Sequence, residues 1–296
     1  MSSSITLRTC GKWILCGEHS VLRGSPAIAF PFQSQFFLIE FLKNDQPLSL
    51  VSVGSGDLPH LEPFSKALDR GLSLLTKMRQ DLPGTISANA NITLGAGLGG
   101  SATLCVTVGR LFAELGWLKT LELFNFCREL ENVFHGKSSG LDVAVILAGQ
   151  GIHFEMSGDY HLIKNNWTPN WFLSYSGVSS GTANDIEKVR KFILQNTGEG
   201  RNTDELMTAS AVLAERALGC SEAEGLPYLV KSIDQAGQCF FRWGLPPNQM
   251  ISQIEKIKAA GALAAKPTGS GGGGYILSLW PSGITPKVEG IVFYKA

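Results

Sequence analysis

A glycine-dense stretch at residues 91–109, NITLGAGLGGSATLCVTVG, has the pattern of a strand, a loop and the start of a helix. Glycine allows positive φ angles and a close approach of the backbone to a ligand. The loop contains Gly95, Ala96, Gly97, Leu98, Gly99, Gly100, Ser101 and Ala102. Backbone N–H groups and the positive end of the helix would point at one place, which suits a phosphate. A simple strand-to-helix turn is the alternative, because a glycine pattern alone is weak evidence.

Three ionisable residues gather near the N-terminus. Residues 5–15 alternate in character as a strand does, and Lys12 lies among apolar neighbours on one of its faces. Such a lysine is more often an edge residue whose ammonium group reaches solvent than a catalytic one. Glu18 and His19 follow Gly17 directly, however, so that polar groups concentrate at the end of this strand.

Two carboxylates flank the loop HGKSSGLD at 135–142. Glu131 falls in the last turn of a predicted helix, where the helix dipole disfavours a carboxylate unless Arg128 or Lys137 neutralises it. Asp142 precedes an apolar segment, where it could cap a helix or act as a base in a dry site. Residue types alone leave both alternatives open.

Composition excludes several functional classes. The chain has 296 residues, 25 basic and 25 acidic, with a formal net charge of zero, so bulk charge does not favour nucleic acid or an anionic membrane. No apolar run is long enough to span a bilayer, and the first residues lack a secretory signal pattern. We therefore expect a soluble, cytoplasmic protein.

The six cysteines, at 10, 16, 105, 127, 220 and 239, are scattered and lack zinc-site spacing. We expect reduced, mostly buried thiols, none of them a nucleophile.

The remaining pattern mixes strands and helices. Strands are predicted at 5–15, 36–42, 48–53, 85–93, 151–155, 171–175, 275–280 and 290–294. Helices are predicted at 64–78, from near 101 to 116, and at 121–134, 183–195, 204–218, 226–243 and 248–260. A polar surface loop is expected at 196–202. The polar stretch 157–169 suggests two domains, 1–163 and 164–296.

Three stretches together resemble the motifs of the GHMP small-molecule kinases: GKWILCGEHSVLRGSPAIA at 11–29, GAGLGGSATL at 95–104 and KPTGSGGGGY at 266–275. Within this superfamily, the first stretch is most similar to the mevalonate kinases, and HGKSSGLD is similar to their HGxPSGxD. The resemblance implies a two-domain α/β (α+β) fold, with a ribosomal-S5-like N-terminal domain, which binds ATP, and a ferredoxin-like C-terminal domain. The implied activity is ATP- and Mg²⁺-dependent phosphorylation of the primary hydroxyl of mevalonate. The resemblance also implies that the protein can form a homodimer.

The same resemblance implies a role for each candidate residue. The loop from Gly95 to Ala102 would cradle the phosphates, and Ser101 with Glu131 would hold Mg²⁺. Asp142 would accept the proton of the attacking hydroxyl, while Lys12 would pair with Asp142 and stabilise the transferring phosphoryl group. The acceptor would be positioned by His19, Glu18, Thr182 and Gly271. For Ser101 and Thr182, a helix N-cap is the structural alternative.

Two departures from the family pattern leave other functions open. Gly100 stands where many members have serine, and Lys137-Ser138 replaces a pair that ends in proline. The alternatives are a phosphomevalonate, homoserine or sugar kinase, or a GHMP-fold protein that binds a ligand without catalysis.

Overall fold

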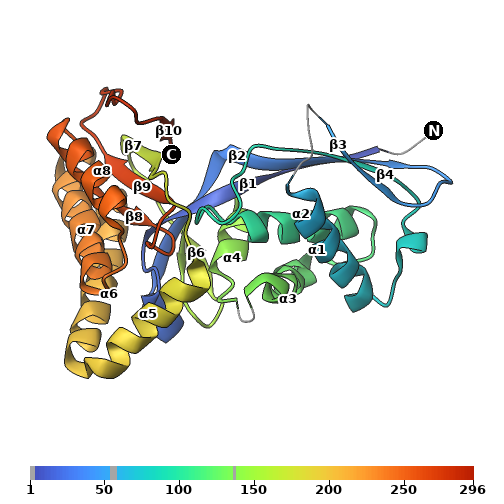
Figure 1. The fold of residues 1–296 in the computed structure, drawn as a ribbon, viewed down its shortest axis with the longest axis horizontal. Helices are drawn as coiled ribbons and strands as arrows, with labels where there is room; N and C mark the ends of the chain where they lie inside the picture. The colour runs from blue at the N-terminus through green and yellow to red at the C-terminus, as the bar shows by residue number, and fades with distance from the viewer. Residues whose placement is uncertain (1–3, 54–58, 136–137) are drawn as a thin grey trace.

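The computed structural model describes residues 4–53, 59–135 and 138–296 (Figure 1). Lys137, one of the two departures from the family pattern, lies outside these residues. Within them, the protein forms two sheets with helices packed beside each.

The first sheet has six strands. These are β1 (Ser4–Cys16), β2 (Ala27–Lys43), β3 (Ser49–Ser52), β4 (Gly84–Ala90), β5 (Ile152–Phe154) and β6 (Tyr160–Leu162). Their order is β3-β4-β2-β5-β6, with β1 also paired to β2. All pairs are antiparallel except β3 with β4.

Four helices lie on one face of this sheet (Figure 1). They are α1 (Leu61–Leu74), α2 (Gly100–Glu114), α3 (Leu123–His135) and α4 (Leu141–Ala148). Helix α2 is almost fully buried, because its sequence is apolar or small on every side. Its position at the centre of this layer fixes the glycine loop that precedes it.

The second sheet contains β7 (Trp171–Tyr175), β8 (Ala264–Thr268), β9 (Tyr275–Leu279) and β10 (Phe293–Lys295), in the order β10-β7-β9-β8. Its helices are α5 (Thr182–Gln195), α6 (Thr197–Gly219), α7 (Glu222–Arg242) and α8 (Asn248–Ala259). The mixed α/β class predicted from the sequence is confirmed, whereas the boundary at 163/164 stays a prediction.

The long strands β1 and β2 connect the two sheets (Figure 1). The Trp13 ring on β1 stacks on Phe30 of β2 at a centroid distance of 5.0 Å and meets Trp171 of β7 edge-on at 4.9 Å. The Thr268 hydroxyl on β8 donates to the Ile14 carbonyl at 2.8 Å and accepts from the Ile14 N–H at 3.1 Å. A continuous core therefore joins the two sheets beside the ionisable end of β1.

Three details of the prediction are wrong. Residues 196–202, expected as a surface loop, are helical from Thr197. The buried Gly200 lets α6 pack against Ile193 of α5, because a Cβ at residue 200 would lie only 3.1 Å from the Ile193 side chain. Strand β6 has no apolar alternation and was missed. The motif stretch at 266–275 is strand up to Thr268, where β8 ends, so its glycine loop begins only at Gly269.

Five of the cysteines are buried and all six are free thiols, as expected. No described helix combines the length and the apolar character needed to cross a membrane.

Candidate active site

A cavity of about 680 Å³ brings together the three motif stretches. Lys12, Glu18, His19, Ser101, Glu131, Asp142 and Thr182 all line it. Their elements are β1 and the turn after it, α2, α3, α4 and α5, which come from both halves of the chain. Residues predicted from separate motifs therefore face one space.

The glycine loop alternates between the cavity and the core. Its lining residues are Gly95, Gly97, Gly99, Gly100 and Ser101. Ala96, Leu98 and Ala102 are instead buried in the apolar core. The core contacts hold the loop in place while its glycines present backbone to the cavity. Of the eight loop residues predicted to bind nucleotide, these three act at most through their backbone or their packing.

Helix α2 begins at the loop with a left-handed residue. Gly99, at φ 73°, is the N-cap, so the helix-capping alternative for Ser101 is wrong. Ser101 lies in the first turn of α2, where N–H groups lack partners within the helix. A Cβ on Gly99 would lie 2.7 Å from the Cγ of Lys12. The loop and the lysine stem therefore fit together only because residue 99 is glycine.

Lys12 and Asp142 form an ion pair in this cavity. The Lys12 Nζ lies 3.0 Å from the Asp142 Oδ1, with the lysine side chain 4% and the aspartate 25% exposed. The backbone N–H of Lys12 also donates to the Leu98 carbonyl at 2.9 Å, and this hydrogen bond joins β1 to the glycine loop. Asp142 is in the first turn of α4, whose N-cap is Gly140, so Asp142 does not cap this helix. The pair places a carboxylate and an ammonium group at the base of the glycine loop.

Glu131 supplies a second carboxylate to the cavity. It is buried, and the Ser138 hydroxyl donates a hydrogen bond to it. Burial and the nearby Asp142 charge raise the pKa of Glu131 to about 7, against the opposing effects of Ser138 and Lys12. Two carboxylates thus face one lysine, which leaves excess negative charge in a largely buried place.

This donor set fits a Mg²⁺ ion. Carboxylate and hydroxyl oxygens are hard ligands, and a divalent cation would relieve the cost of a buried Glu131 carboxylate. Ser101 and Glu131 line the same cavity, and their role as metal ligands stays a prediction.

His19 is buried beside the glycine loop that follows β8. Its Nε2 lies 2.8 Å from the Ser270 carbonyl oxygen, and burial lowers the pKa of the imidazole. Its backbone has φ 58°, an unusual value for a non-glycine residue. Burial thus favours the neutral ring, and Nε2 carries the proton of this hydrogen bond because a carbonyl oxygen can only accept.

Glu18 is held in a buried ion pair that the sequence did not indicate. Lys266 donates to the Glu18 Oε1 at 2.5 Å, and both side chains are almost fully buried. The Glu18 Oε2 is buried and has no hydrogen-bond partner among the described residues. One oxygen is thus anchored by Lys266, while the other is buried without a hydrogen-bond partner among the described residues.

The glycine loop that follows β8 packs against the loop from Gly95 to Ala102. A Cβ on Gly269 would lie 3.1 Å from Gly97, and one on Gly274 would lie 2.4 Å from the Ala96 carbonyl oxygen. Gly269 and Ser270 line the cavity. Gly271 is not among the lining residues and packs against Phe240 instead. Gly271 therefore does not line the cavity, whereas the two residues before it do, and a substrate contact in this loop stays a prediction.

Thr182 is the first residue of α5 and lines the cavity. The N-cap is Gly181, so Thr182 does not have the capping role that was its alternative. In the preceding loop, the Ser180 hydroxyl donates to the Gly95 carbonyl at 2.9 Å. The second half of the chain thus contacts the first glycine of the loop directly.

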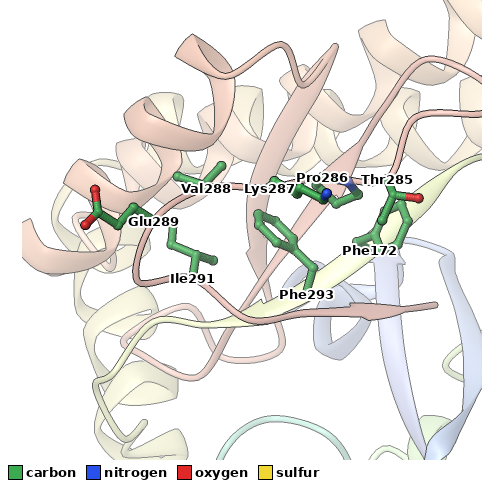
Figure 2. A pocket seen from close by; sticks show the side chains of 8 residues that line it. All are labelled: Phe172, Thr285, Pro286, Lys287, Val288, Glu289, Ile291 and Phe293. Atoms are coloured by element: carbon green, nitrogen blue, oxygen red, sulfur yellow. The ribbon is translucent and has the colours of Figure 1, made fainter.

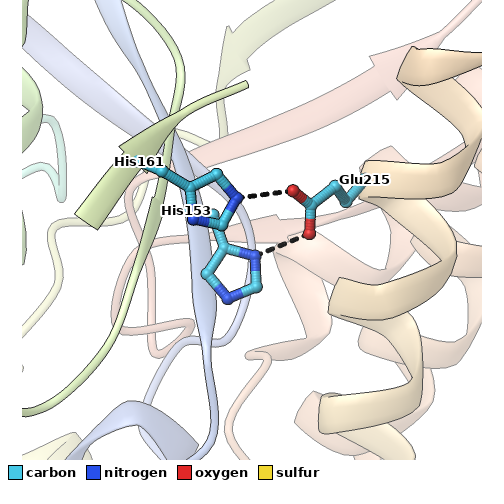
Figure 3. A group of neighbouring side chains, drawn as sticks. All are labelled: His153, His161 and Glu215. Carbon is cyan, nitrogen blue, oxygen red and sulfur yellow. Dashed lines mark hydrogen bonds and ion pairs between the residues drawn. The ribbon is translucent and has the colours of Figure 1, made fainter. Parts of the chain in front are cut away.

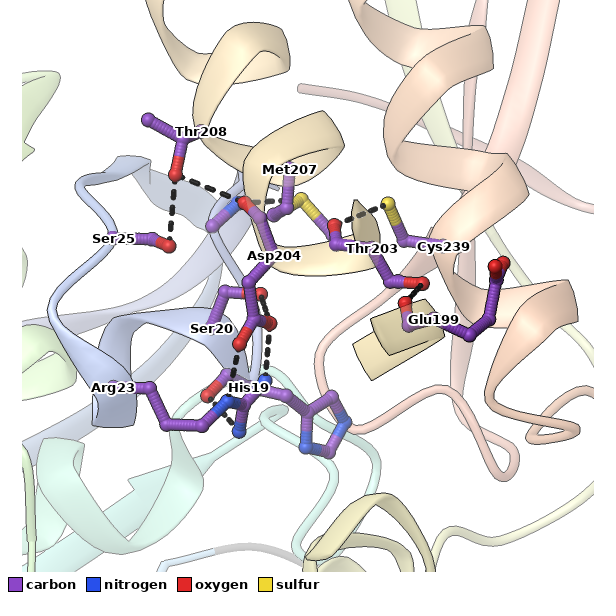
Figure 4. Close-up of polar contacts among 11 residues, drawn as sticks. His19, Ser20, Arg23, Ser25, Glu199, Thr203, Asp204, Met207, Thr208 and Cys239 are labelled. Carbon is purple, nitrogen blue, oxygen red and sulfur yellow. Dashed lines mark hydrogen bonds and ion pairs between the residues drawn. The ribbon is translucent and has the colours of Figure 1, made fainter. Parts of the chain in front are cut away.

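A polar network supports His19 from α6 (Figure 4). Asp204 accepts from Arg23 Nε at 2.7 Å and Nη2 at 2.6 Å, and from the Ser20 hydroxyl at 2.8 Å. Arg23 also donates to the His19 carbonyl at 3.1 Å. Sequence reasoning missed this network, because Asp204 follows Arg23 by 181 positions and stands in no motif.

A second pocket, of about 420 Å³, has no lining residue in common with this cavity (Figure 2). It is formed by Phe172, Thr285, Pro286, Lys287, Val288, Glu289, Ile291 and Phe293. No residue predicted to be functional lines it.

Comparisons with known proteins agree with this geometry. The N-terminal domain model of GHMP kinases matches residues 66–150. Mevalonate kinases from Aeropyrum pernix and Thermococcus gammatolerans are 27% and 28% identical, over 92% and 91% of this chain and 87% of each relative. The crystal structure of L. major mevalonate kinase in complex with R-mevalonate superposes with a TM-score of 0.80 at 22% identity, covering 95% of this chain and 89% of that one. The predicted fold is thereby confirmed.

Proposed function

We propose that this chain, which belongs to the GHMP kinase superfamily, is an ATP-dependent kinase that transfers the γ-phosphoryl group to the primary hydroxyl of mevalonate. The observation that carries the proposal is the Lys12–Asp142 pair at the base of a glycine loop, in one cavity with Glu131. Phosphoryl transfer needs an anion cradle, an acceptor for the hydroxyl proton and compensating positive charge. The described residues supply each of these.

The nucleotide end of the cavity combines polar backbone with apolar side chains. Loop glycines and the first turn of α2 offer N–H groups to the β- and γ-phosphates. Pro63, Leu94, Leu104 and Phe134 line the cavity as well and suit the flat face of a purine. We therefore assign this end to ATP.

Ser101 and Glu131 would hold the Mg²⁺ that accompanies ATP. When bound, the ion neutralises negative charge on the phosphate oxygens. Ser138 keeps the Glu131 carboxylate in one orientation through its hydrogen bond.

Asp142 accepts the proton of the acceptor hydroxyl. The hydroxyl oxygen forms a bond to the γ-phosphorus as the bond between this phosphorus and the β–γ bridging oxygen breaks, and ADP leaves. Lys12 holds Asp142 in place at 3.0 Å, and its ammonium group also stabilises charge on the transferring phosphoryl group.

The acceptor side is formed by Glu18, His19, Thr182, Gly269 and Ser270, which all line the cavity. These groups offer donors and acceptors to the hydroxyls of a small polyol acid. Among the described residues that line the cavity, Lys12 carries the positive charge that would meet the mevalonate carboxylate. Homodimer formation and a cytoplasmic location, expected from the sequence, stay predictions.

A coupled assay of ADP release tests the proposal. With Mg-ATP, mevalonate should be turned over in preference to phosphomevalonate, homoserine, galactose and shikimate. Preferred turnover of another acceptor would overturn the substrate assignment. Stabilisation by ATP and mevalonate without any ADP release would instead identify a non-catalytic binding protein.

A further inference from the structure

A histidine-carboxylate cluster lies on the outside of the fold, away from the motif residues (Figure 3). It is composed of His153 on β5, His161 on β6 and Glu215 on α6. We propose that these three residues bind one divalent transition-metal ion of the zinc class, which clasps the β5–β6 hairpin to α6. None of them lines the candidate active site.

The backbone places the two imidazoles side by side. His153 and His161 are directly opposite each other in the antiparallel β5–β6 pair, so their side chains leave the same face of the hairpin. The rings stack at a centroid distance of 4.6 Å with an interplanar angle of 23°. A turn of α6 brings Glu215 to the edge of both rings (Figure 3). Three elements thus direct nitrogen and oxygen ligands to one point.

The distances suit a metal site after a small shift. The His153 Nδ1 lies 2.8 Å from Glu215 Oε2, and the His161 Nε2 lies 2.6 Å from Glu215 Oε1. One ligand atom from each residue falls within 4.8 Å of the others. Tetrahedral zinc with bonds of about 2.0–2.1 Å separates its ligand atoms by roughly 3.3 Å. An ion therefore fits with shifts of about 1 Å or less, most easily in the exposed His161 side chain.

The hydrogen bonding of His153 favours an added cation. Carboxylate oxygens face both of its nitrogens, since Nε2 also lies 3.0 Å from Glu155 Oε1. A neutral imidazole has a single N–H and can donate to only one of them. With a metal on Nδ1, the proton stays on Nε2 and is donated to Glu155. This is the outer carboxylate arrangement that commonly orients metal-binding histidines.

The chemistry of the cluster also selects the metal class. Two imidazoles and a carboxylate suit zinc, nickel and copper ions, whereas magnesium and calcium prefer oxygen ligands alone. Glu215 and Glu155 together balance the charge of a divalent cation. The side chain of His161 is 60% exposed, which leaves a path for the ion and room for a water ligand.

A metal ion bound at this cluster would join distant parts of the chain. Glu215 precedes the end of α6, and the same helix carries the Asp204 that supports His19. Metal binding would favour the folded arrangement over the unfolded chain, and the protein would be more stable with zinc.

The test uses tag-free, nucleotide-free protein stripped with EDTA. Calorimetric titration with zinc chloride should give one equivalent bound, and zinc should raise the melting temperature while equal magnesium should not. His161→Ala and Glu215→Gln should each weaken this binding at least ~10-fold, and Glu155→Gln by roughly 10-fold. Cobalt bound to the wild type should show the visible absorption of a tetrahedral ion, and this signal should be lost in His161→Ala.

Two control variants distinguish zinc binding at His153, His161 and Glu215 from zinc binding by other side chains. Asp142→Asn and Cys220→Ser should bind zinc as the wild type does. Melting curves without metal would identify a variant that fails to fold, in which case the other ligand variant decides. Equal zinc affinity in the wild type, His161→Ala and Glu215→Gln would overturn the proposal, as would binding lost only in one of the controls. Neither result depends on kinase activity, so the proposed function is tested separately.

Discussion

The Lys12 ammonium group lies 3.0 Å from the Asp142 carboxylate, across 130 residues of chain, at the base of the glycine loop. The lysine is almost fully buried, so its charge acts in a medium of low polarity. This relationship determines which variants should lose catalysis without losing the fold.

Asp142→Asn removes the proton acceptor but keeps the shape of the side chain. We expect kcat to fall by ~10² or more, with the KM for ATP little changed, because general-base catalysis contributes on this scale. Lys12→Met should lower kcat similarly, and the double variant should be only slightly worse than either single one, since the two groups act together. Steady-state kinetics with mevalonate measures this. Near-wild-type turnover in Asp142→Asn would remove Asp142 from its role.

The aliphatic part of the Lys12 side chain leaves no room for a Cβ at position 99 of the glycine loop. Gly95 and Gly99 have similar left-handed φ angles, 70° and 73°, but only at Gly99 would a Cβ contact Lys12, at 2.7 Å. Alanine at either position costs about 1 kcal/mol or more in backbone strain. Gly99→Ala should also displace Lys12, and its kcat should fall much further than that of Gly95→Ala.

Melting temperatures and kcat of the two alanine variants provide the measurement. Because the strain is matched, the difference in kcat isolates the contact with Lys12. Equal kcat values in the two variants would show that this contact does not position the lysine.

Glu131 should make stability depend on pH in the metal-free protein. Its pKa rises from the ordinary 4.5 to about 7 in the folded state, so the folded state binds more protons than the unfolded state between these values. The contribution of Glu131 to stability is therefore complete below pH 4.5 and is lost as pH rises through about 7. A shift of this size corresponds to about 3 kcal/mol.

Glu131→Gln is the matched variant. The free energy of unfolding of the wild type, measured with EDTA, should fall relative to the variant as pH increases from 5 to 8. A constant difference over this range would contradict the raised pKa. The variant should also need a higher Mg²⁺ concentration for half-maximal ADP release, because it has lost a carboxylate ligand of the ion.

Local motifs made much of the site predictable. Lys12, Ser101, Glu131 and Asp142 stand in short patterns whose residue types suit phosphoryl transfer, and the structure places them in one cavity. The partners of these residues were not predictable. Lys266 pairs with Glu18 across 248 positions, and no local pattern indicates which buried lysine meets which carboxylate.

Packing explains the errors in the predicted fold. Residues 196–202 are polar and contain two glycines, which is typical of a loop, but contacts with α5 extend α6 through them. Gly100 shows a similar effect of tertiary context. A Cβ there would lie 2.7 Å from Cδ2 of Leu94, so the serine common in the family would require that side chain to move.

Asp204 should control acceptor binding through Arg23. It accepts two hydrogen bonds from the guanidinium group and one from Ser20, and Arg23 in turn donates to the His19 carbonyl. Charged hydrogen bonds of this type contribute about 1.5–3 kcal/mol. Asp204→Ala should free the turn that carries His19, whose φ of 58° needs support from its surroundings. The KM for mevalonate should therefore rise more than kcat falls.

A double-variant cycle separates this positioning role from a general loss of stability. If Asp204 acts through Arg23, the KM effect of Asp204→Ala should largely disappear in an Arg23→Ala background, giving a coupling energy of about 0.5–3 kcal/mol. Glu187→Ala provides a control for a lost ion pair, because Glu187 pairs with Arg190 on the exposed side of α5. Additive KM effects of Asp204→Ala and Arg23→Ala would mean that each residue acts on the acceptor site independently.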